Sequence, residues 1–225
     1  MDTKVEKVMT TDVVAISEHM PFKQIVRELR RHGVNAAPVM LEGTVLGMIS
    51  TTDLLLKEAD PNAAEDPHPF AGPRRRAEVR KSAGTEARDL MTAPAITVAP
   101  DATVEEAARI MRRKHVSRLP VVESSTGRLV GIVSRSDVLG VYRRSDEEIR
   151  EDVVKEVMSD QFAMDAQRCT VRVSGGRVTV EGTVDRRSVI PLLLHGIRCV
   201  EGVVSAEARL SWEVDDTYAQ HYPTF

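Results

Sequence analysis

Hydrophobic and polar positions follow the same order twice in the first two thirds of the chain. In MPFKQIVRELRRHG (20–33), the apolar residues recur every three or four positions, which predicts an amphipathic helix, and Gly33 is suited to end it. Two short apolar runs follow, APVML (37–41) and TVLGMIS (44–50), joined by a glycine-containing turn that is typical of paired strands. DLLLKEA (53–59) predicts a second helix. With an apolar strand before residue 20, the expected order is strand–helix–strand–strand–helix.

The second occurrence has the same elements. Thr103 and Glu106 predict a capping box for a helix whose apolar face contains Val104, Ala107 and Met111. The runs LPVVE (119–123) and RLVGIVS (128–134) predict two strands, and DVLGVYR (137–143) predicts the closing helix. Between the two occurrences, residues 61–85 are rich in proline and then in basic residues, and we expect an exposed, mobile linker there.

Aligning the chain with itself shows that these two occurrences are copies of one unit. VMTTDVVAI (8–16) matches LMTAPAITV (90–98), VNAAPVM (34–40) matches VSRLPVV (116–122), and GMISTTDLL (47–55) matches GIVSRSDVL (131–139). The landmarks keep their order at nearly constant spacing, so we expect domains at 1–60 and 86–144. Because one copy alone buries only one face of its sheet, the two copies are expected to pack together.

A different pattern begins at residue 145. Ser145 and Glu148 predict a capping box, CTVRVSGGRVTVEGTV (169–184) alternates apolar and polar residues around Gly175-Gly176, and a helix with Ser188 as its cap and Pro191 in its first turn follows. GVVSAEARLSWEV (202–214) predicts a last strand. We therefore expect a small α-β-β-α-β domain over 145–215 and a tail over 216–225.

Composition and charge narrow the class of protein. Residues 1–144 contain 22 Lys/Arg and 19 Asp/Glu, whereas residues 145–225 contain 9 and 15, which supports a domain boundary near 145. The first residues lack the apolar core of a signal peptide, and no apolar run is long enough to span a membrane, so we expect a cytoplasmic protein.

Cys169 and Cys199 lie in no metal-ligand pattern and are expected to stay reduced, although the sequence leaves a disulfide between them open. The basic run RRRAEVRK (74–81) lacks interleaved aromatic residues, which favours a solvated linker over a nucleic-acid site.

The repeated landmarks resemble CBS motifs, regulatory modules that pair into a Bateman module. The resemblance implies an α+β fold, a homodimer through the paired modules, and an adenosyl ligand (AMP, ADP, ATP, S-adenosylmethionine or cyclic di-AMP) between the motifs. An ionised aspartate offers two acceptor oxygens to a ribose diol, so Asp53 and Asp137 are the candidates for that contact. The nearby hydroxyls of Ser50, Thr52, Ser134 and Ser136 suit phosphate oxygens. The adenine is expected between backbone and small side chains of both copies: Thr11, Val13, Ala36, Ala37, Pro38, Thr92, Pro94, Ile96, Ser117, Leu119 and Pro120.

The Ser-x-x-Asp motif also has a purely structural interpretation. Serine can cap a helix while aspartate favours the positive end of its dipole, and this alternative stays open for both copies. Between the copies, the second is favoured as the ligand site because Arg118 and Arg135 add positive charge, whereas the first has Ala36 and Thr51 at those positions. His32 and His115 are further candidates for phosphate contacts, or are solvated helix ends.

The C-terminal pattern resembles a BON domain, a family associated with phospholipid surfaces and with ligand sensing. The absence of an export signal and the acidic balance of this segment favour a protein-interaction or output role, while a local patch of Arg168, Arg172, Arg177, Arg186 and Arg187 leaves lipid contact open. The leading hypothesis is a non-catalytic sensor that needs no cofactor, binds an adenosyl ligand and relays occupancy to the C-terminal domain. The alternative is a dimeric structural or membrane-surface adaptor. An enzyme is disfavoured, because the sequence has no Ser-His-Asp order, no metal-ligand cluster and no Walker or Rossmann glycine pattern.

Overall fold

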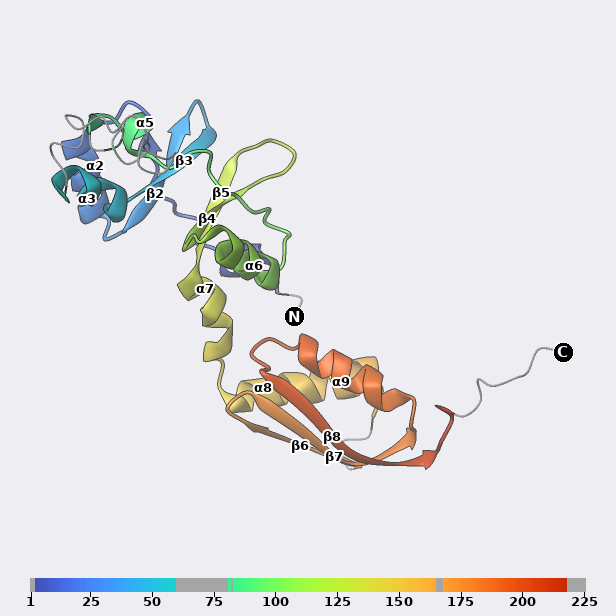
Figure 1. Cartoon of the computed structure of the whole chain (residues 1–225). Helices are drawn as coiled ribbons and strands as arrows, with labels where there is room; N and C mark the ends of the chain where they lie inside the picture. Colours follow the sequence, from blue (N-terminus) through green and yellow to red (C-terminus); the bar gives the residue numbers. More distant parts are fainter. Residues whose placement is uncertain (1–2, 60–80, 82, 165–167, 218–225) are drawn as a thin grey trace, which may run out of the picture. The chain divides into compact units, whose positions relative to one another are not determined.

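A computed structural model describes residues 3–59, 81, 83–164 and 168–217 (Figure 1). They form two compact units, one of residues 4–102 and 106–135 and one of residues 3, 103–105 and 136–217. Most of the expected linker, residues 60–80 and 82, lies outside the described part, and so do residues 218–225 of the expected tail. In the described part of the chain, no helix combines the length and apolar character that a bilayer span needs.

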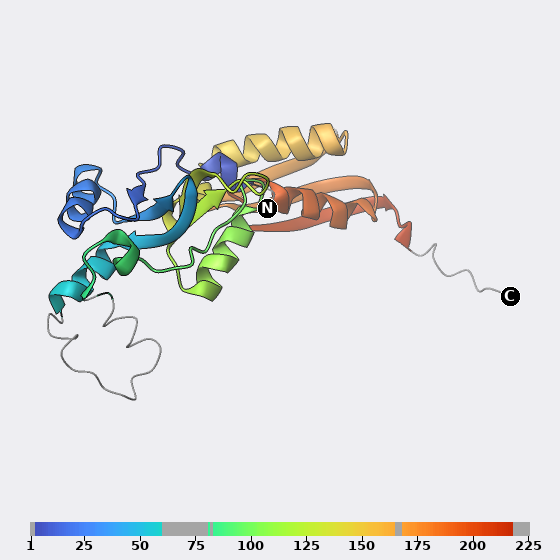
Figure 2. The same ribbon diagram turned by 90° about the horizontal axis from the view of Figure 1, so that it is seen from above.

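The first copy has the expected order of elements. A short helix, α1 (Val5–Val8), precedes β1 (Ile16–Ser17), α2 (Phe22–Arg31), β2 (Ala36–Leu41), β3 (Thr44–Ser50) and α3 (Thr51–Ala59). Strand β2 pairs with β1 in parallel and with β3 antiparallel, and Figure 2 shows α3 continuing from the end of β3. Gly33 follows α2 with a φ of +64°, a left-handed conformation that glycine adopts without strain and that ends a helix.

The second copy repeats this order with a shorter sheet. Helix α5 (Ala87–Leu90) is followed by α6 (Val104–Lys114), β4 (Arg118–Val122), β5 (Leu129–Ser134) and α7 (Arg135–Gly140). Strands β4 and β5 are antiparallel, and the first expected strand is reduced to a single parallel bridge between Val98 and Val121. Apolar side chains of α6, β4 and β5 are buried, as their periodicity predicted: Ala107, Met111, Leu119, Val121 and Val133.

The start of each copy packs on the other copy. The backbone of Thr92 exchanges two hydrogen bonds with Met48 of β3 (2.8 and 3.0 Å), and that of Thr10 exchanges two with Ile132 of β5 (2.9 Å each). Helix α5 lies in the core of the first copy, where Ala87 and Leu90 are fully buried. The two copies are therefore interleaved, because each completes its partner's packing.

Gly47 and Gly131 make this close approach feasible. A Cβ on Gly47 would lie 2.7 Å from both the Met91 Sδ and the Thr92 carbonyl oxygen, and one on Gly131 would lie 2.5 Å from the Met9 Sδ. A Cβ on Gly47 would collide with backbone, so that glycine is required for packing, whereas a Cβ on Gly131 would mainly displace the Met9 side chain.

The C-terminal unit contains the expected α-β-β-α-β order. Helix α7 continues through a 3₁₀ turn, η1 (Val141–Arg143), to α8 (Asp146–Asp152) and a π-helical segment, η2 (Val153–Gln161). Strands β6 (Cys169–Ser174) and β7 (Arg177–Arg186) are antiparallel, and β8 (Ser205–Val214) runs parallel to β7. Helices α8 and α9 (Val189–Cys199) lie on one face of this sheet (Figure 1), above a core that includes Ile149, Val178, Val180, Leu193 and Ile197.

Local signals explain the hairpin and the helix starts of this unit. Gly175 and Gly176 form the turn with φ values of +59° and +71°, and Ser145 and Glu148 make both hydrogen bonds of the expected capping box. Pro191 lies in the first turn of α9, as predicted. Ser188 is at the N-cap position but does not cap the helix, because its hydroxyl donates to Asp216 (2.7 Å) instead.

Asp146 fastens the hairpin turn to the start of α8. Its two carboxylate oxygens accept hydrogen bonds from the backbone amides of Gly175 and Gly176, each 2.8 Å long. These bonds favour the charged form and hold the pKa of Asp146 below its ordinary value.

Replacing Gly47 by alanine is expected to destabilise the interleaved copies. The new methyl group collides with backbone as well as with Met91, and overpacking of this kind costs about 1–3 kcal/mol. Urea unfolding measures the loss. Gly140→Ala is the matched control, since its Cβ would meet nothing within 4 Å. Equal stability of the two variants would contradict the close approach.

Asp146→Asn is expected to lower the Tm at neutral pH. Because the pKa of Asp146 is lowered in the folded state, its contribution is present above the unfolded pKa and disappears as the pH falls through the folded value. The Tm difference between wild type and variant should therefore shrink below about pH 4. Thermal unfolding from pH 3 to 7 measures this, with Glu151→Gln on the same helix as control. A difference that is independent of pH would contradict the role of the carboxylate charge.

Candidate functional site

A cavity of about 370 Å³ lies in the first unit and is lined by both copies. This volume is within the range of about 300–1,000 Å³ that is typical of small-molecule sites. The first copy contributes the end of β3, the start of α3 and one residue of β2, while the second contributes the segment after α5 and the turn between α6 and β4. The lining residues are Ala36, Met48, Ser50, Thr52, Asp53, Thr92, Pro94, Ala95, Ile96, Lys114, His115, Val116, Ser117 and Arg118.

Ser50 and Asp53 cap helix α3. The Asp53 amide donates to the Ser50 Oγ (3.3 Å), and the Ser50 amide donates back to the Asp53 Oδ2 (2.9 Å). This reciprocal pair has the form of a capping box, with aspartate in the third helical position. The Ser50 hydroxyl also donates to the Asp53 Oδ2, at 2.6 Å. The structural interpretation of the Ser-x-x-Asp motif is therefore confirmed in the first copy.

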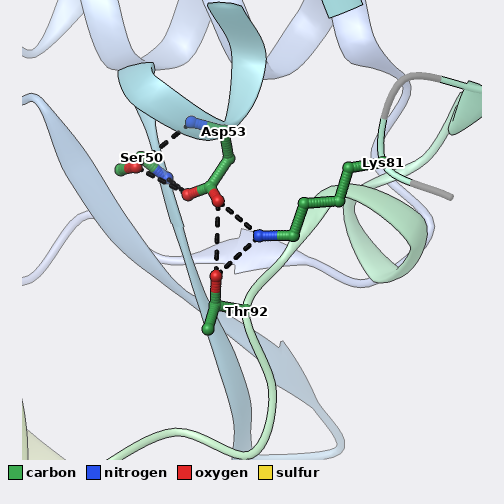
Figure 3. Close-up of polar contacts among 4 residues, drawn as sticks. All are labelled: Ser50, Asp53, Lys81 and Thr92. Carbon is green, nitrogen blue, oxygen red and sulfur yellow. Dashed lines mark hydrogen bonds and ion pairs between the residues drawn. The ribbon is translucent and has the colours of Figure 1, made fainter. Parts of the chain in front are cut away.

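The other oxygen of Asp53 is occupied by different donors (Figure 3). The Lys81 ammonium forms an ion pair with the Asp53 Oδ1 and also donates to the Thr92 Oγ1 (2.6 Å). The Thr92 hydroxyl lies 3.3 Å from the same Oδ1 and donates to it. The Lys81 and Asp53 side chains are 11% and 14% exposed, so this pair is largely shielded from water.

Three cationic or protonatable side chains line the same cavity. Lys114 is the last residue of α6, His115 follows with a φ of +56°, and Arg118 begins β4. Lys114 and His115 are exposed and Arg118 is partly buried. Because the charge of Asp53 is paired with Lys81, the remaining charge in the cavity is positive, and its chemistry suits an anionic group.

The structure brings together ten of the residues proposed from sequence, one of them His115, and separates the others. The ten that line the one cavity are Ala36, Ser50, Thr52, Asp53, Thr92, Pro94, Ile96, His115, Ser117 and Arg118. Four other candidates, which follow Ala36 in β2 and Arg118 in β4, are buried and do not line the cavity: Ala37, Pro38, Leu119 and Pro120. Thr11 and Val13 follow the segment that pairs with Ile132.

The residues assigned to the second copy have a different placement. Ser134 ends β5, and Arg135, Ser136 and Asp137 form the first turn of α7. The Arg135 guanidinium donates to the Val116 carbonyl oxygen (3.0 Å), so it contacts backbone at this point. Arg118, which favoured the second copy in the sequence comparison, lines the cavity of Asp53 instead. The charge argument therefore applies to the cavity of Asp53, because the second copy contributes Arg118 to its lining.

Lys81 is the residue that sequence reasoning missed. The basic run that ends at position 81 predicted solvated side chains, and for Lys81 this prediction was wrong, because the residue is 8% exposed. The available signal was its position six residues before the first residue of α5, a helix that packs in the core of the first copy. Among the arginines of the C-terminal patch, Arg168, Arg172 and Arg187 are paired with acidic side chains, so their charges are compensated.

Comparison with known families finds a match for the repeated part of the chain. The CBS domain model matches residues 5–60 and 87–144, which together make up half of the sequence. The chain belongs to the CBS-domain family. The two matched segments correspond to the two copies and exclude the C-terminal domain, for which the resemblance to BON domains stays a prediction.

Several curated proteins share this CBS region. The inosine-5′-monophosphate dehydrogenase of Korarchaeum cryptofilum is 28% identical over 142 residues, which are 63% of this chain and 24% of that enzyme. The CBS domain-containing protein YhcV of Bacillus subtilis is 26% identical over 145 residues, covering 64% of this chain and 89% of YhcV. The match spans less than half of the first relatives, including 44% of an uncharacterised protein of Methanocaldococcus jannaschii that is 30% identical.

Solved structures support the fold of the CBS pair. CBSX2 of Arabidopsis thaliana, determined in complex with AMP, aligns with a TM-score of 0.51 and 24% identity over 61% of this chain and 94% of that one. The CBS domain pair of protein MJ0100, in complex with 5′-methylthioadenosine and S-adenosyl-L-methionine, aligns with a TM-score of 0.50 and 21% identity over 62% of this chain and 99% of that one.

Asp53→Ala is expected to destabilise the first unit by about 3–5 kcal/mol, because it leaves the buried Lys81 ammonium without its carboxylate. Adding Lys81→Met should recover the part of this loss that comes from the unpaired ammonium, but not the part that comes from the lost cap of α3. Chemical unfolding of the single and double variants measures both effects, and Asp12→Ala, at an exposed carboxylate of the same unit, is the control. A loss no larger than that of the control would show that the ion pair contributes little stability.

Proposed function

We propose that this protein is a non-catalytic sensor that binds an adenine nucleotide in the cavity around Asp53. The observation that carries the proposal is the juxtaposition of a carboxylate with three cationic or protonatable side chains, Lys114, His115 and Arg118, in one cavity. A carboxylate suits the ribose diol, and the cations suit phosphate oxygens. Thr92, Pro94 and Ile96 supply the small and apolar surface for the base. The complex of CBSX2 with AMP supports a nucleotide of this class.

Phosphorylated ligands are favoured over S-adenosylmethionine. That molecule carries a sulfonium, an ammonium and one carboxylate, a net charge of +1, and it would meet the cationic side chains of Lys114 and Arg118 in the same cavity. AMP, ADP and ATP present the opposite charge. Cyclic di-AMP has the right charge but two nucleosides, and the cavity of about 370 Å³ is small for it.

The C-terminal domain is proposed as the output part of the sensor, with the α-β-β-α-β order of a BON domain. Helix α7 belongs to the same compact unit as this domain, and η1 and α8 follow it without a long loop. Arg144 ties the junction to the domain through Asp152 (2.6 Å) and the Glu201 carbonyl oxygen (3.4 Å). The compensated arginines favour contact with a protein over contact with anionic lipid.

We also propose a homodimer through helices α2 and α3. A mainly apolar groove of about 500 Å³ runs along them and is lined by Phe22, Val26, Leu29, Leu54 and Leu55, among others. Leu55 is 63% exposed. A surface of this kind is suited to burial against another apolar surface, and a second copy of this chain supplies one.

Arg118→Met is expected to weaken AMP binding about tenfold or more, because it removes a charge-assisted hydrogen bond to phosphate. Adenosine, which has no phosphate, should bind wild type and variant equally. Isothermal titration calorimetry with AMP, ATP, adenosine and S-adenosylmethionine measures this. Arg113→Met, an exposed residue of α6 that does not line the cavity, is the control. Tighter binding of S-adenosylmethionine than of AMP would contradict the assignment, and no binding of any of the four would refute the proposed function.

A further inference from the structure

The carboxylate of Asp53 has no acceptor position left for a ligand. Each oxygen of an ionised carboxylate accepts about two hydrogen bonds. Oδ2 accepts from the amide and the hydroxyl of Ser50 (2.9 and 2.6 Å), and Oδ1 accepts from Lys81 and from the Thr92 hydroxyl. A ribose diol adds two further O–H donors, which need acceptors that are already in use.

The two pairs of donors differ in how readily they can leave. The Ser50 contacts belong to the capping box of α3, so their loss would unwind the start of the helix. The Lys81 ammonium is instead carried at the end of a flexible four-carbon side chain, and the Thr92 hydroxyl can rotate about one bond. A ligand can therefore donate hydrogen bonds to Oδ1 of Asp53, but only if it displaces the Lys81 ammonium.

The chain positions Lys81 at this carboxylate from a firmly attached segment. The Gly84 amide donates to the Lys81 carbonyl oxygen (3.1 Å), and the Thr85 carbonyl accepts from the Phe22 amide (2.9 Å). The Ala87 amide donates to the Met20 carbonyl oxygen (3.0 Å). A Cβ on Gly84 would lie 2.8 Å from that of Asp89, so the chain is tightly packed at Gly84. The contact thus follows from the fold of the described residues 83–90.

We propose that Lys81 is a built-in competitor for the ribose-binding carboxylate, so that ligand and lysine exclude each other at Asp53. The inference rests on the proposed function and adds a regulatory step to the same site. Only molecules in which Lys81 has left Asp53 can bind the ligand, so the apparent affinity for the ligand falls as the fraction of molecules with the ion pair rises. Ligand binding then releases the buried Lys81 ammonium from Asp53 of the first copy. The binding event therefore changes the position of a charged group outside the ligand itself.

Lys81→Met tests the competition directly. The variant keeps the length and apolar part of the side chain but donates nothing to Asp53, so AMP is expected to bind about tenfold more tightly than to wild type, as measured by calorimetry. Lys114→Met, which removes a cavity cation, should weaken AMP binding and is the opposing control. Either of two results with a folded Lys81→Met protein would overturn the proposal. Unchanged AMP binding would show that Lys81 does not compete, and weaker binding would show that Lys81 contacts the ligand.

A second measurement uses the wild-type chain and does not depend on the stability of a variant. Amine acetylation followed by mass spectrometry reports the exposure of each lysine, with and without saturating AMP. The reaction at Lys81, which is 11% exposed, should accelerate on binding, whereas that at Lys114 should slow. Unchanged or slower labelling of Lys81 with AMP bound would refute the displacement while leaving the proposed function intact. Failure of AMP to bind to either wild type or Lys81→Met would refute both.

Discussion

The backbone pairing between Met48 and Thr92 determines how the two CBS copies form a site. These two hydrogen bonds, together with the equivalent pair between Thr10 and Ile132, place the beginning of each copy on the last strand of the other. Gly47 and Gly131 leave the space that this approach requires. As a result Thr92 lies beside Asp53, and the cavity cannot form from one copy alone.

Much of this fold was predictable because it depends on local signals. The periodicity of α2, the hairpin at Gly175-Gly176 and the capping box at Ser145 are each encoded within a few consecutive residues, and each formed as expected. The first strand of the second copy was not, because only Val98 pairs with Val121 there. Strand pairing depends on distant partners, which the local pattern does not identify.

The site was predictable in its residues but not in their grouping. An internal repeat shows which positions are equivalent, yet it does not show which copy they face. Arg118 was therefore taken as a reason to favour the second copy, although it lines the cavity of Asp53. Lys81 was missed for a related reason: a lysine in a basic run is usually solvated, and its burial depends on the packing of residues 83–90 on the first copy.

The two oxygens of Asp53 perform separate tasks, and this division affects how the Ser-x-x-Asp motif persists. Oδ2 starts the helix, while Oδ1 faces the group that competes for the cavity. A copy that has lost its ligand would still need the aspartate to begin its helix, so natural selection on folding alone can maintain the motif. The signature therefore marks where a binding site can evolve or be restored, and its survival in a repeat is independent of whether that repeat is occupied.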